Sequence, residues 1–183
     1  MEGKKKAKPV FTEEEARELA RLLKKVARNN YLFPDEESFR ALHEIRSMWA
    51  LELVIWKKKS PGEKEILLVR YSGGAREFRG LWHIPGGYDV FLEPDFQAVC
   101  SKIAKRELGM NVKYVRIVGE HKWKPEEHPY GRPLSLYIQC EPLGKIEETK
   151  EVRFFGVGKL PKRLVKPHRR FLKSFLRKKS SYH

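Results

Sequence analysis

Residues 80–110 contain the groups in this chain that are best suited to chemistry. The stretch reads GLWHIPGGYDVFLEPDFQAVCSKIAKRELGM and places two adjacent glycines some 20 residues before Glu107. Adjacent glycines allow backbone groups to approach a ligand that a Cβ would obstruct. A carboxylate near such a turn could hold a metal ion together with the phosphates that accompany it. Taken alone, Pro-Gly-Gly is also a common turn. The rest of the segment therefore has to distinguish a functional loop from an ordinary turn.

A strand and a helix are expected to position these groups. Residues 81–84 predict a short strand that ends at the glycine pair. Asp95 predicts the N-cap of a helix over residues 96–108, and Gly109 predicts its end. The buried stripe of that helix would consist of Phe96, Val99, Cys100, Ile103 and Ala104.

The same residues resemble the signature of the Nudix superfamily, G-x5-E-x7-R-E-U-x-E-E-x-G-U, in which U is aliphatic. Gly87 and Glu93 match its opening, residues 107–110 match its closing E-x-G-U, and residues 82–87 are similar to its lead-in strand. The resemblance covers about residues 49–176. It implies an α/β protein, a Nudix-like α/β/α sandwich with a mixed sheet. It also implies hydrolysis of a nucleoside diphosphate linked to another moiety, with Mg²⁺ or Mn²⁺.

The chain departs from the signature on the helix itself. The spacing from Gly87 to Gly109 is one residue longer than the signature, which indicates an insertion in the loop after Glu93. Counted back from Gly109, Ile103 and Arg106 stand where the family has glutamates, so that Glu107 alone remains. A second dication beside an inward-pointing arginine would be repelled. We therefore expect a single divalent ion.

The resemblance implies a ligand set for that ion. Glu107 is the first candidate and the carbonyl of Gly87 the second. Glu93 is a further candidate, although an ion pair with Lys102 is the more typical role of its position. Mg²⁺ often binds through one or two carboxylates and completes its octahedron with water and substrate phosphates.

A helix that keeps only the last of these glutamates is similar to that of the GDP-mannose mannosyl hydrolases. This similarity implies a nucleotide sugar as substrate. Arg70 ends a predicted strand where those enzymes have an arginine that steadies the departing diphosphate. Residues 147–155 correspond to the stretch that holds their histidine base, yet contain no histidine. Glu148 or Glu151 could supply a carboxylate base instead, and ordinary exposed glutamates are the alternative.

A proline-containing loop offers a surface for a base or a sugar. Trp123, His128 and Tyr130 supply rings and hydrogen-bonding groups around Pro125 and Pro129, and His121 precedes them. The alternative is that some of these side chains only pack the loop. His83, in the lead-in strand, is interpreted as a structural histidine.

The flanking elements divide the chain into three parts. Residues 1–11 predict a disordered basic N-terminus, residues 12–46 a helical extension, and residues 47–183 a Nudix-like domain with a basic C-terminal helix. In the extension, Thr12 and Glu15 predict a capping box for a helix over 13–28, and a second helix is expected after Pro34. Strands are predicted at 49–55, 65–71, 112–120, 134–140 and 151–156, with residues 57–62 as a polar link.

Composition narrows the function classes further. The 183 residues carry a net charge of +15, of which residues 159–183 supply ten cations and no acid. This favours either a solvated helix face or, as an alternative function, a catalytically inactive binding module that holds RNA or a ribonucleoprotein through its basic termini. No apolar run is long enough for a membrane span, and Cys100 and Cys140 have no zinc-type spacing. We expect a cytoplasmic protein, of undetermined oligomeric state.

Overall fold

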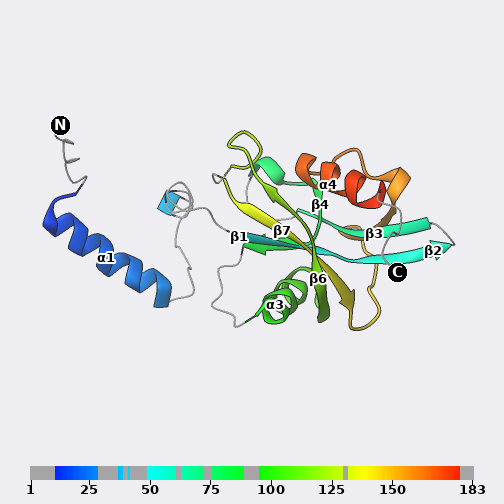
Figure 1. Cartoon of the computed structure of the whole chain (residues 1–183), viewed down its shortest axis with the longest axis horizontal. Coiled ribbons are helices and arrows are strands. Elements are labelled where there is room, and N and C mark those ends of the chain that lie inside the picture. The colour runs from blue at the N-terminus through cyan, green and yellow to red at the C-terminus, as the bar shows by residue number, and fades with distance from the viewer. Residues whose placement is uncertain are drawn as a thin grey trace, which may run out of the picture.

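Two four-stranded sheets form the centre of the molecule (Figure 1). The computed structural model describes residues 11–28, 37–38, 41, 49–60, 63–71, 76–88, 95–129 and 132–177. The first sheet has the order β5-β1-β7-β6, with β1 and β7 parallel and the other pairs antiparallel. The second has the order β2-β3-β4, and β8 also pairs with β3. The strands are β1 (Trp49–Val54), β2 (Trp56–Ser60), β3 (Glu63–Arg70), β4 (Trp82–His83), β5 (Gly86–Tyr88), β6 (Val112–Lys122), β7 (Leu134–Pro142) and β8 (Val152–Gly156).

Helices α3 (Phe96–Leu108) and α4 (Lys166–Arg177) cover opposite faces of the sheets (Figure 1). Successive residues of β1 alternate between the faces. Leu51 and Leu53 join the α3 stripe in one buried cluster, whereas Val54 joins Leu172 of α4 in the other. The predicted α/β/α sandwich with a mixed sheet is therefore confirmed.

Local signals place α3 as expected. The Asp95 side chain accepts a hydrogen bond from the Ala98 amide at 2.8 Å, and Gly109 ends the helix in the left-handed conformation, with φ 68°. The predicted stripe is buried in the core, with Phe96 partly buried at its edge. The later strands and the helix after Pro161 also lie where predicted.

The polar link predicted at residues 57–62 is wrong in part. Lys57–Ser60 continues as β2 and pairs with β3. This strand has no apolar alternation, because its lysines are exposed. Lys57 instead lies 3.9 Å from the ring centroid of Phe154, so that contacts with neighbouring strands hold it in place.

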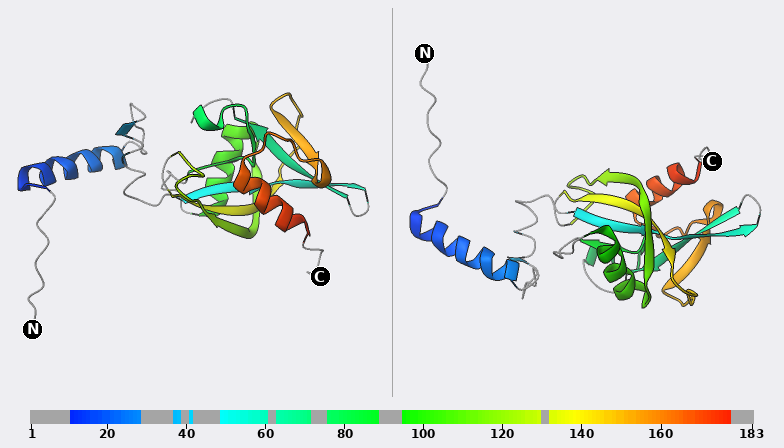
Figure 2. Two further views of the ribbon diagram at one scale, coloured as in Figure 1. Left: turned by 90° about the horizontal axis from the view of Figure 1, so that it is seen from above. Right: turned by 60° about the horizontal axis from the view of Figure 1, so that its bottom comes forward.

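Helix α1 (Glu13–Arg28) is present with the predicted cap. The Thr12 amide donates to Glu15 Oε2 at 2.8 Å, and the Glu15 amide donates to Thr12 Oγ1 at 3.2 Å. Its apolar residues are nevertheless exposed, Leu19 by 37% and Leu23 by 41%, and α1 stands apart from the sandwich in every view (Figure 2). The predicted second helix lies almost wholly outside the described residues. No helix in the described ranges is both long and apolar enough to span a membrane.

Candidate functional site

Strand β5 separates two polar groups that lie on opposite faces of the sheet. Gly86 pairs with Glu52 of β1, and Gly87 pairs with Leu51. A Cβ at Gly86 would overlap the carboxylate of Glu52, whereas a Cβ at Gly87 would overlap the guanidinium of Arg106. Each glycine thus makes room for a different charged side chain, one on the α4 face and one on the α3 face.

On the α3 face, Arg106 connects the helix to β5. Its Nε donates to Glu107 Oε1 at 2.8 Å, and its Nη2 donates to the Gly86 carbonyl at 3.1 Å. The side chains of Arg106 and Glu107 are 47% and 24% exposed. The guanidinium therefore lies between the predicted acidic metal ligand and the glycine pair, at the carbonyl of Gly86 rather than that of Gly87.

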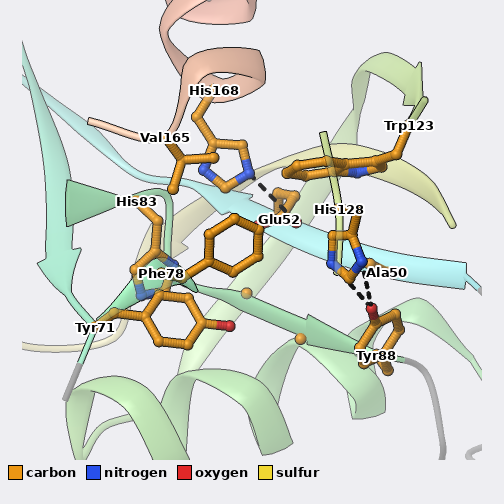
Figure 3. Close-up of a pocket in the computed structure, with 12 residues that line it drawn as sticks. Ala50, Glu52, Tyr71, Phe78, His83, Tyr88, Trp123, His128, Val165 and His168 are labelled. Atoms are coloured by element: carbon orange, nitrogen blue, oxygen red, sulfur yellow. Dashed lines mark hydrogen bonds and ion pairs between the residues drawn. The ribbon is translucent and has the colours of Figure 1, made fainter. Parts of the chain in front are cut away.

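On the α4 face, a cavity of about 70 Å³ opens beside the same glycines (Figure 3). Aromatic rings from several segments surround it, and two acid–base groups from β1 and α4 complete its wall. These side chains include Tyr71, Phe78, Tyr88, Trp123, His83, His128, Glu52 and His168. A larger, more open hollow of about 550 Å³ adjoins it and shares Phe78, His128 and Val165. Together they reach the size usual for small-molecule sites.

Glu52 is the acidic centre of this cavity and is only 6% exposed. Its Oε1 accepts a hydrogen bond from Ser135 Oγ at 3.2 Å, and Ser135 Oγ accepts one from Trp123 Nε1 at 2.8 Å. The pairing of β1 with β7 brings Glu52 and Ser135 to one face although they are 83 residues apart. These two hydrogen bonds hold both the Glu52 carboxylate and the Trp123 indole ring in position.

His168 faces Glu52 from α4 (Figure 3). Its Nδ1 accepts the Ile84 amide at 3.1 Å, so that the proton of the neutral ring is on Nε2. That Nε2 lies 3.6 Å from Glu52 Oε1, is buried, and has no hydrogen-bond partner in the part of the chain that the structure describes. The pair therefore presents both a buried donor and a carboxylate at the cavity wall.

His83 lines the cavity as a neutral ring. Burial lowers its pKa to about 3, and electrostatic interactions with His168 and Arg106 add to the lowering, against a hydrogen bond to the Ile84 carbonyl. The structural role predicted for His83 fits this environment.

The predicted ring surface is present in part. Trp123 is 4% exposed, and its ring lies 4.8 Å from that of His128 in an edge-on contact. His128 Nε2 also lies 3.0 Å from the hydroxyl of Tyr88. His121 lies 3.1 Å from Glu127, outside the cavity lining. Tyr130 lies outside the described residues, as does Glu93.

The other predicted catalytic residues lie away from the cavity lining. Arg70 is exposed and its Nε donates to the Gly80 carbonyl at 3.3 Å. Glu151 donates its amide to Thr149 Oγ1 at 3.1 Å and accepts the Arg70 amide at its carbonyl. The Phe154 amide lowers the pKa of Glu148, and Lys57 adds to this effect against slight burial. Neither glutamate belongs to the lining of the cavity.

Sequence reasoning missed Glu52, His168 and Tyr88. A signal existed for Glu52, since it is the only charged residue in the apolar run of residues 49–55. No local pattern distinguishes His168 within the basic C-terminal helix. Its role arises from packing. The backbone of Trp82 donates a hydrogen bond to Arg163 and accepts one from Val165, and these bonds place the start of α4 beside β4.

No protein-family model matches the chain, and no curated protein matches it. Solved structures do match. An ADP-ribose pyrophosphatase from Streptococcus suis is 24% identical, with a TM-score of 0.53, over 75% of this chain and 96% of that one. A MutT protein from Methanosarcina mazei is 19% identical, with a TM-score of 0.56, over 72% and 94%. A UDP-X diphosphatase is 20% identical, with a TM-score of 0.54, over 91% and 85%. The chain therefore has the fold of these proteins, two of which are named as pyrophosphate-cleaving enzymes.

The residues around Gly86 do not fit the divalent ion that the Nudix resemblance implies. Arg106 donates to Glu107, the predicted acidic ligand, and to the carbonyl of Gly86, next to the predicted ligand Gly87. Ile103, which stands at another ligand position, is fully buried and has no oxygen to offer. Across the described ranges, no three His, Cys, Asp or Glu side chains are grouped to hold a metal.

Proposed function

We propose that this chain binds a nucleoside diphosphate linked to another moiety and hydrolyses it, with a nucleotide sugar as the substrate class to test first. One observation carries the proposal: the Gly86–Gly87 strand lies between a partly exposed arginine and an aromatic cavity. A guanidinium suits the diphosphate, and the rings suit a base or sugar. The likeness to an ADP-ribose pyrophosphatase and a UDP-X diphosphatase supports the same class.

The proposal assigns roles on both faces of β5. Glu107 holds Arg106 in position and supplies the carboxylate nearest to the diphosphate. Trp123 and His128 form the surface for the base or sugar. Arg70 and Glu151 stay predictions from sequence, as does the single Mg²⁺ or Mn²⁺ ion, and each can be tested in the same assay.

The test is a turnover assay on ADP-ribose, UDP-glucose, GDP-mannose and ATP, with Mg²⁺, with Mn²⁺ and with EDTA. Products are separated by ion-exchange chromatography. We expect Glu107→Gln to lower turnover at least about tenfold, because it removes a charged hydrogen-bond partner of Arg106. Glu141→Gln, an exposed carboxylate on β7, serves as the matched control and should change nothing. Turnover that is unchanged in Glu107→Gln would contradict the assignment.

The second candidate function is binding without hydrolysis, and the Arg106–Glu107 ion pair favours it. Fold alone does not establish catalysis. Probe binding without product formation would select this candidate. RNA binding through the basic tail has less support, since Arg170 already pairs with Glu127 and Arg169 donates to the carbonyls of Pro161 and Lys162.

A further inference from the structure

We infer that Arg106 is the resident cation for a bound diphosphate, and that diphosphate binding by this protein requires no divalent metal. The inference rests on the proposed ligand class, but not on hydrolysis. It starts from the disagreement described above, in which a guanidinium bonds to Glu107, the first ligand that the resemblance implies, and to the carbonyl of Gly86, next to Gly87.

The geometry of Arg106 leaves donors for a ligand. A guanidinium has five N–H groups in a fixed fork. The N–H of Nε is directed to Glu107 and one N–H of Nη2 to Gly86, so that three have no hydrogen-bond partner among the described residues. The side chain is 47% exposed, and solvent can reach these groups. Two contacts to the protein fix the fork, and the free donors match two phosphate oxygens.

The surroundings of Arg106 are shaped for a guanidinium. A Cβ at Gly87 would overlap Nη2, so the glycine leaves room for the guanidinium in its present position against β5. Behind it, Ile103 is buried in the core and brings no negative charge. An ion pair with a single carboxylate leaves Arg106 able to attract an anion, whereas a dication placed beside it would be repelled.

The position of Arg106 also connects it to the cavity. Its nearest strand, residues 86–87, forms part of the cavity lining. Its charge contributes to the lowered pKa of His83 on that lining. Because β5 is the edge strand of its sheet in the order β5-β1-β7-β6, a ligand whose base or sugar contacts the aromatic rings could extend around that edge and place its phosphates at Arg106.

The experiment measures binding of ADP and UDP-glucose by isothermal titration calorimetry, in EDTA and in excess Mg²⁺. For the wild-type protein we expect dissociation constants that agree within about threefold between the two conditions, since the protein supplies the cation. Arg106→Gln should weaken binding in EDTA by about tenfold or more. Lys105→Gln removes a neighbouring exposed charge of α3 and serves as the control, with near wild-type affinity expected.

A gain-of-function variant makes the test independent of nucleotide binding. Arg106→Glu creates two adjacent carboxylates beside the Gly86 carbonyl, a donor set that suits a hard dication. Titrated with Mn²⁺ alone, this variant should bind at least about tenfold more tightly than the wild-type protein. Circular dichroism melting of each variant confirms that the fold is retained.

The outcomes separate this inference from the proposed function. Binding that appears only with Mg²⁺ and persists in Arg106→Gln overturns the inference and leaves the proposed function intact. Metal-free binding that requires Arg106, without turnover, supports the inference and contradicts hydrolysis. If neither probe binds under any condition, both are overturned. Equal Mn²⁺ affinity in the wild-type protein and Arg106→Glu would also overturn the inference.

Discussion

The two faces of the Gly86–Gly87 strand use charge in opposite ways. On the α4 face, Glu52 is 6% exposed and His168 is 3% exposed, and the carboxylate is held by Ser135. On the α3 face, Arg106 and Glu107 are partly exposed to solvent. Buried polar groups cost much free energy when a partner is removed, whereas exposed ion pairs contribute little to stability.

This difference separates what the fold requires from what a ligand requires. The Glu52 group connects β1, β7 and α4, so that its removal should be felt by the whole sandwich. Within the described residues, the Arg106 group connects α3 with β5, and the arginine side chain is 47% exposed. Stability should therefore depend mainly on Glu52 and His168, whereas binding of the diphosphate should depend mainly on Arg106.

The largest stability effect is expected from Glu52→Ala. The substitution leaves the Ser135 hydroxyl and the Nε2 of His168 buried without their acidic neighbour. We expect the free energy of unfolding to fall by about 2–3 kcal/mol, measured by urea denaturation. Glu52→Gln keeps an acceptor and should cost less. Glu120→Ala, an exposed residue of β6, is the control, and a loss below 1 kcal/mol in Glu52→Ala would contradict the buried role.

The two faces also differ in how far sequence could predict them. The observed bounds of helix α3 agree with the prediction, because its cap, its stripe and its terminal glycine are all local signals. Gly87 and Glu107 followed from the same segment, and Trp123 and His128 from a loop with unusual ring content. These features need no knowledge of distant residues.

The buried face depends on contacts that sequence does not display. Glu52 meets Ser135 through the parallel pairing of β1 with β7, and the Ile84 amide meets His168 at a separation of 84 residues. The direction of the Arg106 side chain could not be predicted from sequence either, because its rotamer depends on contacts with β5. Strand β2 was missed since exposed lysines give no alternating pattern.

The next effect concerns the pH dependence of stability and belongs to the buried face. His83 has a pKa of about 3 in the folded protein, chiefly through burial, against 6.5 ordinarily. Between these values the unfolded chain binds a proton that the folded chain does not, so stability falls as pH falls below 6.5. We expect the titration of His83 to lower the free energy of unfolding by about 1.5 kcal/mol between pH 6.5 and pH 5.

His83→Gln isolates that contribution. The free energy of unfolding of the wild-type protein and of the variant is measured by urea denaturation at several pH values from 5 to 6.5. The difference between their pH dependences removes the titration of the other histidines. Glu127, whose partial burial is outweighed by hydrogen bonds from Arg170, the Lys124 amide and His121, has a pKa of about 2. Its stabilising contribution is lost only as pH falls from 4.5 toward 2, below the window used. Identical pH dependence in both proteins would contradict a buried neutral His83.

The smallest stability effect is expected from Glu107→Gln on the exposed face. Its ion pair with Arg106 is partly solvated, and exposed pairs typically contribute about 0.2–1 kcal/mol. Urea denaturation should therefore show a loss below about 1 kcal/mol, and high salt should reduce it further. A loss as large as that of Glu52→Ala would mean that Glu107 stabilises the sandwich rather than the ligand. A small loss of stability together with a strong loss of turnover would mean that the charge of Glu107 serves the diphosphate rather than the fold.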